Sequence, residues 1–303
     1  MSSKEQPRFS VVIPAFNEAH YIADTLDSLQ KQTFNGSVEI IVVDNNSTDK
    51  TAVIAKSLGA KVISEKNPGV CWARQAGTEA AQGEIVISTD ADTKFDSDWL
   101  AVIDKWFKKY PDVVAVTGPC RYVGGPLWGE IYPVLLFDLV SIVYRITGRT
   151  YYSSATNIAF KKGVWNGYDT TMTQGGDELD LLRRLRKKGK VAFNNHNPTY
   201  TSARRLARGF IYNFIITFLI YYILEYNLTR IFKRRVLGSA PKFRNELSPK
   251  IMSLLNGVIY LALLFCFLVY TGWGRHVSKW LYHTARNTST ELREKGTEIR
   301  EKI

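Results

Sequence analysis

Two aspartates separated by one residue form the most chemically suggestive pattern in this sequence. Asp90 ends the run EIVISTD at 84–90, whose β-branched residues are typical of a buried strand, and Asp92 follows it. Carboxylate oxygens bind Mg²⁺ or Mn²⁺, and these ions are commonly shared with substrate phosphates. Just past a strand end, the two side chains can converge on one ion, or on an ion and a ribose hydroxyl. The alternative is a loop in which both side chains make turn hydrogen bonds.

Strands and helices alternate through the first 90 residues. Short apolar runs predict strands at 9–14, 38–44, 60–65 and 84–90, with helices between them, the last at 70–82. This alternation predicts an α/β fold with a mostly parallel mixed sheet between helices, and such sheets bind ligands at the carboxyl ends of their strands. The polar residues expected at that edge are Asn17, Glu18, Asp44, Asp90 and Asp92.

The next hundred residues are less regular. We predict a helix at 98–109, a strand at 112–117, an apolar segment at 131–144 interrupted by Asp138, and a strand at 153–160. The run GGDELDLLRRLRKKGK then predicts a helix. Its first turn is acidic and its last turn basic, as the helix dipole favours.

Five stretches, in this order and spacing, resemble the family 2 glycosyltransferases with the GT-A fold. The resemblance covers about residues 9–205. Within the family, the sequence resembles bacterial-type, membrane-associated members. Five ordered motifs are far more specific than any one of them alone. They are VVIPAFNE at 11–18, IIVVDNNSTDKT at 40–51, ARQAG at 73–77, VISTDADT at 86–93 and GGDELDL from Gly175.

The resemblance implies a role in donor binding for each matching residue. Asp44 would contact the base of the nucleotide, and Arg74 the base or the diphosphate. Asp92 would be the direct metal ligand, with Asp90 nearer the ribose or also on the metal. The first-strand motif would line the nucleotide pocket with Pro14, Asn17 and Glu18.

Each of these residues also has a purely structural interpretation. Pro14 can end a strand, Asn17 can cap a helix, and Glu18 can be a favourable charge at a helix N-terminus. Arg74 can be a solvated surface group.

The resemblance also implies a catalytic base at the start of the helix that follows Gly175. Glu178 takes that position if the register is anchored on Leu181 and Arg184, whereas residue type favours Asp177. Asp177 has a structural alternative as an N-cap, with Asp180 completing a box-like arrangement. Both acids therefore stay candidates.

Three further residues match positions near the sugar or the diphosphate. Asn157 corresponds to a position close to the sugar, although a buried asparagine bonded to the backbone explains it equally. Arg204 and Arg205 would help to neutralise the leaving diphosphate. The longer Gln-x-x-Arg-Trp signature of the family is absent, and lipid headgroups are an alternative partner for both arginines.

The net charge of +12 is concentrated late in the chain, beside long apolar runs. This placement favours anionic membrane lipid or a phosphorylated substrate over nucleic acid. Residues 210–226 are predicted to be an interfacial helix, since a span there would put the seven Lys and Arg of 230–250 outside. The uncharged run at 251–274 is long enough for a transmembrane helix, or for a re-entrant one. The polar N-terminus predicts a catalytic domain on the cytoplasmic side.

Together these patterns predict a membrane-attached, inverting glycosyltransferase that uses a nucleotide-diphospho-sugar donor and a divalent metal. The acceptor is expected to be a lipid-linked or membrane-proximal glycan, or a polyprenyl phosphate. The alternatives are a catalytically silent nucleotide-sugar-binding scaffold and a sugar nucleotidyltransferase. The predicted domains are a catalytic domain at 1–205, an interfacial and basic segment at 206–250, the span at 251–274 and a polar tail at 275–303.

Overall fold

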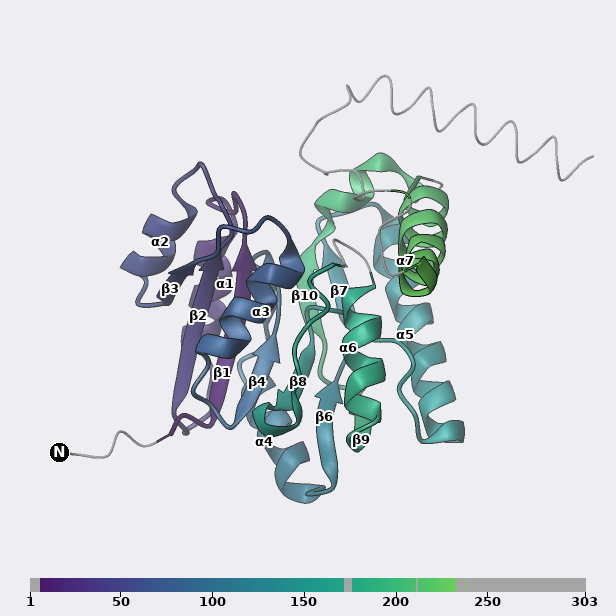
Figure 1. The fold of residues 1–303 in the computed structure, drawn as a ribbon, viewed down its shortest axis with the longest axis horizontal. Helices are drawn as coiled ribbons and strands as arrows, with labels where there is room; N and C mark the ends of the chain where they lie inside the picture. The colour runs from purple at the N-terminus through teal and green to yellow at the C-terminus, as the bar shows by residue number, and fades with distance from the viewer. Residues whose placement is uncertain (1–5, 172–175, 211, 233–236, 238–303) are drawn as a thin grey trace, which may run out of the picture. The chain divides into compact units, whose positions relative to one another are not determined.

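The computed structural model describes residues 6–171, 176–210, 212–232 and 237. The predicted transmembrane segment at 251–274 and the tail at 275–303 lie outside the described residues. Figure 1 shows the arrangement of the helices and strands.

A seven-stranded mixed sheet organises the chain, in the order β3-β2-β1-β4-β8-β6-β9. Neighbouring strands are parallel except at β8, which runs antiparallel to both β4 and β6. The predicted mostly parallel sheet is therefore confirmed. The strands are β1 (Phe9–Ala15), β2 (Val38–Asp44), β3 (Lys61–Ser64), β4 (Ile85–Ser88), β6 (Val113–Thr117), β8 (Ile158–Lys161) and β9 (Lys190–Phe193).

Helices cover both faces of this sheet because successive strand side chains point to opposite faces. In β1, Val11 and Ile13 belong to one hydrophobic cluster and Val12 to another. The first cluster includes side chains of α1 (Ile22–Gln30), α2 (Thr51–Ser57) and α4 (Trp99–Lys109). The second includes those of α3 (Val70–Ala80) and α6 (Asp177–Arg186), which lie on the viewer's side in Figure 1.

Close packing of α3 on the sheet depends on Gly77. A Cβ atom at this position would overlap Cγ1 of Val12 and lie 2.8 Å from Cγ2 of Val43. Replacing Gly77 with Ala should therefore destabilise the fold by about 1–3 kcal/mol, as overpacked cores do, and lower the midpoint of thermal unfolding. Gly163→Ala is the matched control, because nothing lies within 4 Å of its added Cβ. Equal midpoints for the two variants would contradict this packing argument.

A second, three-stranded sheet in the order β5-β10-β7 was not predicted. It consists of β5 (Thr93–Phe95), β10 (Thr199–Ser202) and β7 (Cys120–Val123). β5 begins directly after Asp92, and Thr201 of β10 pairs with Thr93. The two aspartates therefore lie in the connection between the two sheets.

The apolar segment at 131–144 is part of one continuous helix, α5 (Leu127–Thr147). Asp138 interrupts the apolar run of the sequence but not the helix, and its exposed side chain accepts a hydrogen bond from Nδ2 of Asn195 at 2.8 Å. Within the described ranges, α5 is the one helix long and apolar enough to cross a membrane by length and composition.

The predicted strand at 153–160 is also wrong in its first half, since β8 begins at Ile158. Side-chain hydrogen bonds among Ser154, Thr156 and Thr199 hold the preceding residues in an irregular conformation. The chain continues after β10 through η2 (Ala203–Arg208), η3 (Tyr212–Glu225) and α7 (Tyr226–Phe232), so the predicted helix at 210–226 is present.

Candidate active site

Several of the predicted site residues lie at the carboxyl ends of β1, β2 and β4. The register pairs Ala15 with Asp44, so the chain that follows β1 runs beside the end of β2. Pro14 is still within β1, beyond the last residue that pairs with β4, and it does not end the strand. Its missing N–H therefore breaks no pairing with β4.

Asn17 and Asp44 both hold the loop that follows β2. Oδ1 of Asn17 accepts a hydrogen bond from the backbone N–H of Thr48 at 2.7 Å, and Oδ1 of Asp44 accepts one from the N–H of Ser47 at 3.2 Å. Asn17 adopts a left-handed backbone conformation with φ of 53°. The helix-cap interpretation of Asn17 is wrong, because α1 begins after Tyr21 and has no side-chain cap.

Arg74 joins the end of β4 to α6. Its guanidinium donates to Oδ1 of Asp90 at 2.8 Å and is also paired with Oδ2 of Asp177. The side chain is 3% exposed, so the surface interpretation of Arg74 is wrong. Two neighbouring carboxylates raise the pKa of Arg74 although burial opposes this, and the buried charge is thereby paired.

Arg204 makes a second bridge between distant segments. It donates to both carboxylate oxygens of Glu18 at 2.7 Å each, and to Oδ2 of Asp92 at 2.9 Å. Its guanidinium carbon lies 4.7 Å from the ring centroid of Tyr21, a cation–π distance. Arg204 belongs to η2, whose first turn is capped by the side chain of Ser202. The C-terminal end of the catalytic region therefore holds the first-strand motif and the second aspartate together.

Asp92 is buried in this network, and burial raises its pKa. The charge of Arg204 opposes that rise, and Arg205 lies near enough to oppose it as well. Oδ1 of Asp92 also accepts a hydrogen bond from the hydroxyl of Thr201 at 3.2 Å.

Loss of Arg204 should be costly because it leaves two buried carboxylates without their shared cation. We expect Arg204→Ala to lower the free energy of unfolding by about 3 kcal/mol, the lower end for a broken buried pair, since the arginine is partly exposed. Glu18→Gln in the same chain should restore part of this loss. Denaturant unfolding of both single variants and the double variant measures the coupling. If the changes in the free energy of unfolding of the two single variants add up to that of the double variant, the Arg204–Glu18 pair contributes nothing to stability.

The two candidate bases in the first turn of α6 have different surroundings. Asp177 is held by Arg74, whereas burial and then the charge and hydrogen bonding of Asp177 raise the pKa of Glu178 well above its ordinary value. The N-cap alternative for Asp177 is wrong, because α6 starts after Gly176 without a side-chain cap. Asp180 is bonded instead to Arg183 and Arg184, at 2.5 Å each.

Asn157 lies apart from this ion-pair network, just before β8, and its amide is bonded to protein groups. Nδ2 donates to the carbonyl oxygens of Pro119 at 3.0 Å and Asn197 at 2.7 Å, and Oδ1 accepts from Nε1 of Trp99 at 3.2 Å. These bonds match the structural interpretation of a buried asparagine satisfied by its surroundings.

Two residues of the network were not predicted, Tyr21 beneath Arg204 and Thr201 beside Asp92. A tyrosine near the start of a helix carries no signal of cation stacking. Thr201 is 109 residues from Asp92 in a four-residue strand, so its position depends on tertiary structure.

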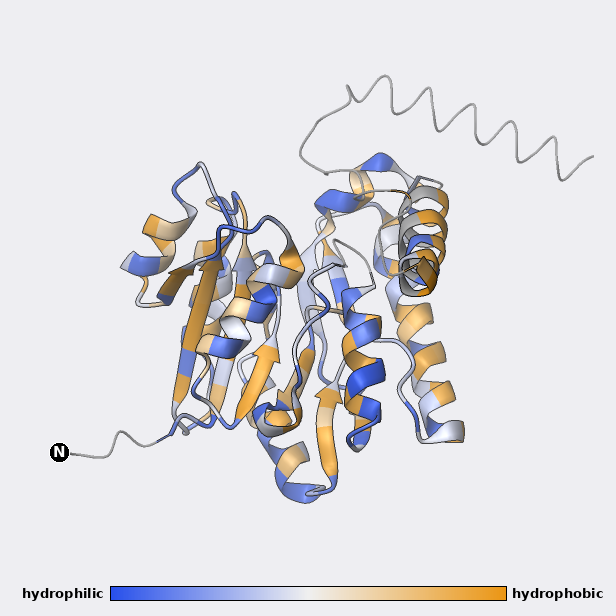
Figure 2. Cartoon of the chain, viewed as in Figure 1, coloured by the Kyte–Doolittle hydropathy of each residue, from blue (hydrophilic) through white to orange (hydrophobic). Residues whose placement is uncertain are grey.

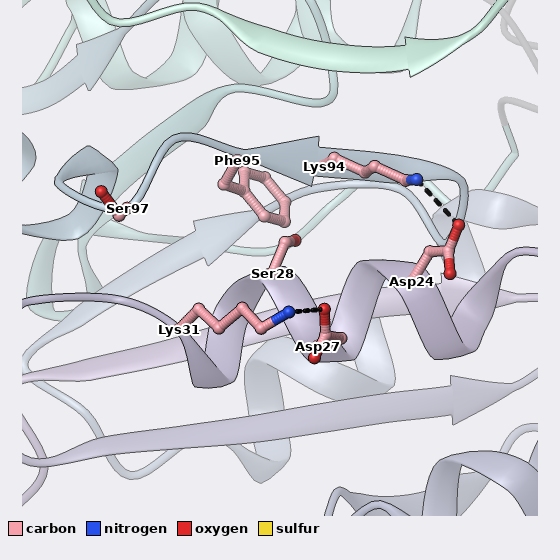
Figure 3. Close-up of a pocket in the computed structure, with 7 residues that line it drawn as sticks. All are labelled: Asp24, Asp27, Ser28, Lys31, Lys94, Phe95 and Ser97. Atoms are coloured by element: carbon pink, nitrogen blue, oxygen red, sulfur yellow. Dashed lines mark hydrogen bonds and ion pairs between the residues drawn. The ribbon is translucent and has the colours of Figure 1, made fainter.

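A surface hollow of about 230 Å³ lies between α1 and β5, away from this network (Figure 3). It contains two exposed ion pairs, Lys94 with Asp24 at 2.8 Å and Lys31 with Asp27 at 2.6 Å. None of the predicted site residues lines it. Exposed ion pairs of this kind contribute little to the free energy of unfolding. We assign no function to the hollow.

No cluster of three or more His, Cys, Asp or Glu side chains suited to a metal ion occurs among the described residues. Asp90 and Asp92 nevertheless fit the chemistry of a nucleotide-linked metal. Mg²⁺ in such sites is held by one or two carboxylates together with substrate phosphates, so two aspartates are a sufficient protein contribution.

The sheet order defines an α/β protein with a mixed sheet, and acidic side chains lie at the ends of β2 and β4. The model of the family described as "Glycosyl transferase family 2" matches residues 10–168, more than half of the chain. The chain belongs to this family.

Two curated relatives indicate the range of the family. The chain is 28% identical over 190 residues to the glucosyl-dolichyl phosphate glucuronosyltransferase of Haloferax volcanii, which covers 56% of this chain and 59% of that protein. It is 36% identical over 179 residues to the 4,4'-diaponeurosporenoate glycosyltransferase of Staphylococcus haemolyticus, covering 55% and 46%. The chain thus spans roughly half the length of these relatives.

The fold has solved counterparts. The structure of S. aureus TarS 1-349 in complex with UDP-GlcNAc is similar with a TM-score of 0.51 and 20% identity, covering 64% of this chain and 58% of TarS. At this identity the likeness establishes the fold alone.

Proposed function

We propose that the protein is an inverting glycosyltransferase that transfers a sugar from a nucleotide-diphosphate donor to a lipid-linked acceptor, a polyprenyl phosphate or a membrane-proximal glycan. The observation that carries the proposal is the pair of arginine bridges. Arg74 joins Asp90 to Asp177, and Arg204 joins Asp92 to Glu18. The first bridge ties one D-x-D carboxylate to the acidic start of α6, and the second ties the other carboxylate to the first-strand motif.

The donor would bind along the edge formed by the ends of β1, β2 and β4. Asp44 would contact the base and Asn17 would line the nucleotide pocket, and Asp90 and Asp92 would hold Mg²⁺ or Mn²⁺ with the diphosphate. The ion, when bound, would neutralise charge that develops on the leaving diphosphate. Arg74, Arg204 and Arg205 would supply further positive charge near the same group.

Glu178 is the better of the two candidate bases. In the transfer, the acceptor oxygen attacks the anomeric carbon from the face opposite the diphosphate, the bond to the diphosphate oxygen breaks, and the acceptor proton passes to the carboxylate of Glu178. Burial and Asp177 raise the pKa of Glu178, which makes its carboxylate the stronger base once it is ionised, whereas Asp177 is engaged by Arg74. A lipid phosphate acceptor would already be anionic and would need no base.

The proposed setting is the membrane, with the catalytic domain on the cytoplasmic side. The support comes from the sequence at 210–226, 230–250 and 251–274, and from the dolichyl phosphate in the name of one relative.

Titration of the full chain with nucleotide diphosphates and nucleotide-sugars, with and without Mn²⁺, tests the donor proposal. Binding of one nucleotide class should be tightened by Mn²⁺ and should raise the unfolding temperature, by an amount that grows with the logarithm of the ligand concentration. No stabilisation by any nucleotide-sugar would contradict the proposal.

A further inference from the structure

Helix α5 carries an apolar stripe along the whole of its outer side. Six aliphatic side chains, spaced three or four residues apart, are between 47% and 79% exposed. The opposite side of the helix, with Gly129, Pro133, Phe137 and Ser141, is buried against the domain. The stripe consists of Leu127, Ile131, Leu135, Leu139, Ile142 and Ile146, and Figure 2 shows the hydrophobic character of this helix.

The six positions of the stripe are apolar over 20 residues, about 30 Å of helix. Asp138 is the one acid that lies among them on the helical projection, and it accepts a hydrogen bond from Asn195. Arg145 and Arg149 are exposed where the helix ends. An apolar surface of this length, bordered by cations, marks an interaction site rather than ordinary protein surface.

The apolar surface continues beyond α5. The ring of Trp128 meets Phe210 edge-on at 5.4 Å, and Phe210 stacks on Phe214 at 5.8 Å. Both phenylalanines are more than two-fifths exposed. The stripe therefore joins the start of η3, in the segment predicted to be interfacial.

The same aromatic cluster leads towards the active site. Trp128 stacks with Tyr132 at 5.9 Å, and Tyr132 lies 5.9 Å from Tyr122 of β7. Tyr122 pairs with Thr201, whose hydroxyl is bonded to Asp92. A row of rings thus connects the apolar surface to the strand beside the D-x-D motif.

We propose that the outer side of α5 lies on an anionic lipid bilayer, with the stripe among the acyl chains and Arg145 and Arg149 at the lipid phosphates. Tryptophan and tyrosine rings are favoured at the interface between the lipid headgroups and the acyl chains. A helix with one apolar side binds in the plane of the membrane surface. The inference rests on the proposed membrane association and adds a surface to it. The aromatic row then connects the bilayer surface to the strand beside the D-x-D motif.

Charge and composition favour the bilayer over two protein occupants. Residues 230–250, which follow η3 and α7, contain seven Lys and Arg, and these are complementary to anionic lipid. The segment at 251–274 is uncharged throughout. If it covered the stripe, the side of this segment that faces away from the stripe would have no apolar partner. A second copy, also carrying a net charge of +12, would be repelled.

Site-directed fluorescence quenching tests the location of the stripe. The full chain, with Cys266 changed to Ser, receives a single fluorophore through Leu135→Cys, and Val53→Cys on α2 is the matched control because Val53 is also apolar and 69% exposed. Cys71 and Cys120 are buried and do not compete for the label. The chain is reconstituted in phosphatidylcholine–phosphatidylglycerol vesicles with either a nitroxide on the acyl chains or iodide in the water.

The label at position 135 should lose fluorescence with the nitroxide lipid and keep it with iodide, and the label at position 53 should do the reverse. Quenching of position 135 by iodide would place the stripe in water and overturn the proposal. Protection from both quenchers would mean that residues 251–274 or a second copy cover it, which also overturns the proposal. The measurement needs no turnover, so failure of the proposed reaction would leave its result intact.

Discussion

Replacing Glu178 with Gln is expected to lower transfer to a hydroxyl acceptor by about 10²–10⁴-fold, the usual contribution of a general base. Gln keeps the size of the side chain but cannot accept the proton. Steady-state kinetics at saturating donor measures the effect as a fall in kcat. Glu79→Gln, an exposed change on α3, is the control and should leave the rate unchanged.

The pH profile separates this role from a structural one. Burial and Asp177 raise the pKa of Glu178, so the carboxylate form, and with it the rate, should increase as pH rises through that raised value. The increase should vanish in Glu178→Gln. The stability of the fold should depend on pH in the opposite direction. Between the pKa of Glu178 in the unfolded state and its higher pKa in the folded state, the folded protein binds more protons than the unfolded chain. The free energy of unfolding therefore falls as pH rises through this window.

Asp177→Asn should act differently from Glu178→Gln. It removes a negative charge that raises the pKa of Glu178, so the rate profile should move to lower pH, with a smaller loss at the plateau. If both variants lose only a little transfer activity and their pH–rate profiles do not change, the result would point instead to an acceptor that is already anionic.

Replacing Asp92 with Ala is expected to abolish the effect of Mn²⁺ on donor binding and to lower turnover by at least about 100-fold. The reason is that metal neutralisation of a leaving diphosphate is worth several kcal/mol, and each 1.4 kcal/mol is tenfold in rate. Calorimetric titration of the donor with and without Mn²⁺ gives a readout that does not depend on turnover. Asp92→Asn, which keeps the hydrogen bond with Thr201 possible, should share the loss.

Asp98→Ala is the matched control for Asp92→Ala, because Asp98 is exposed nearby and its side chain caps no helix. An unchanged Mn²⁺ response in the Asp92 variants would remove this residue from the metal site. In the unaltered protein, burial raises the pKa of Asp92, so metal affinity should weaken as pH falls through that raised value.

The sequence predicted the first half of the fold well because its signals there are local. Strands such as β1 and β2 are continuous apolar runs, and each is followed by a helix-period pattern. The second half depends on contacts between distant segments. β5, β7 and β10 have only three or four residues each, too few for a periodic signal, and they form a sheet only with one another.

The site shows the same division. Asp44, Asp90 and Arg74 were predicted because strand ends and motif order place them at one edge. The partner of each charge could not be predicted, since the Arg204–Glu18 pair joins residues 186 positions apart. The different environments of Asp177 and Glu178 likewise follow from burial and from Arg74, neither of which a linear pattern contains.

The position of Arg74 between Asp90 and Asp177 has a thermodynamic consequence. A ligand that draws the guanidinium away from Asp90 must also change the electrostatic potential at Asp177 and Glu178, because one cation serves both sides. Linkage makes this reciprocal, so the protonation state of Glu178 must alter donor affinity by the same factor. The dissociation constant of the donor should therefore change with pH, and this change should follow the titration of a carboxylate that does not contact the donor.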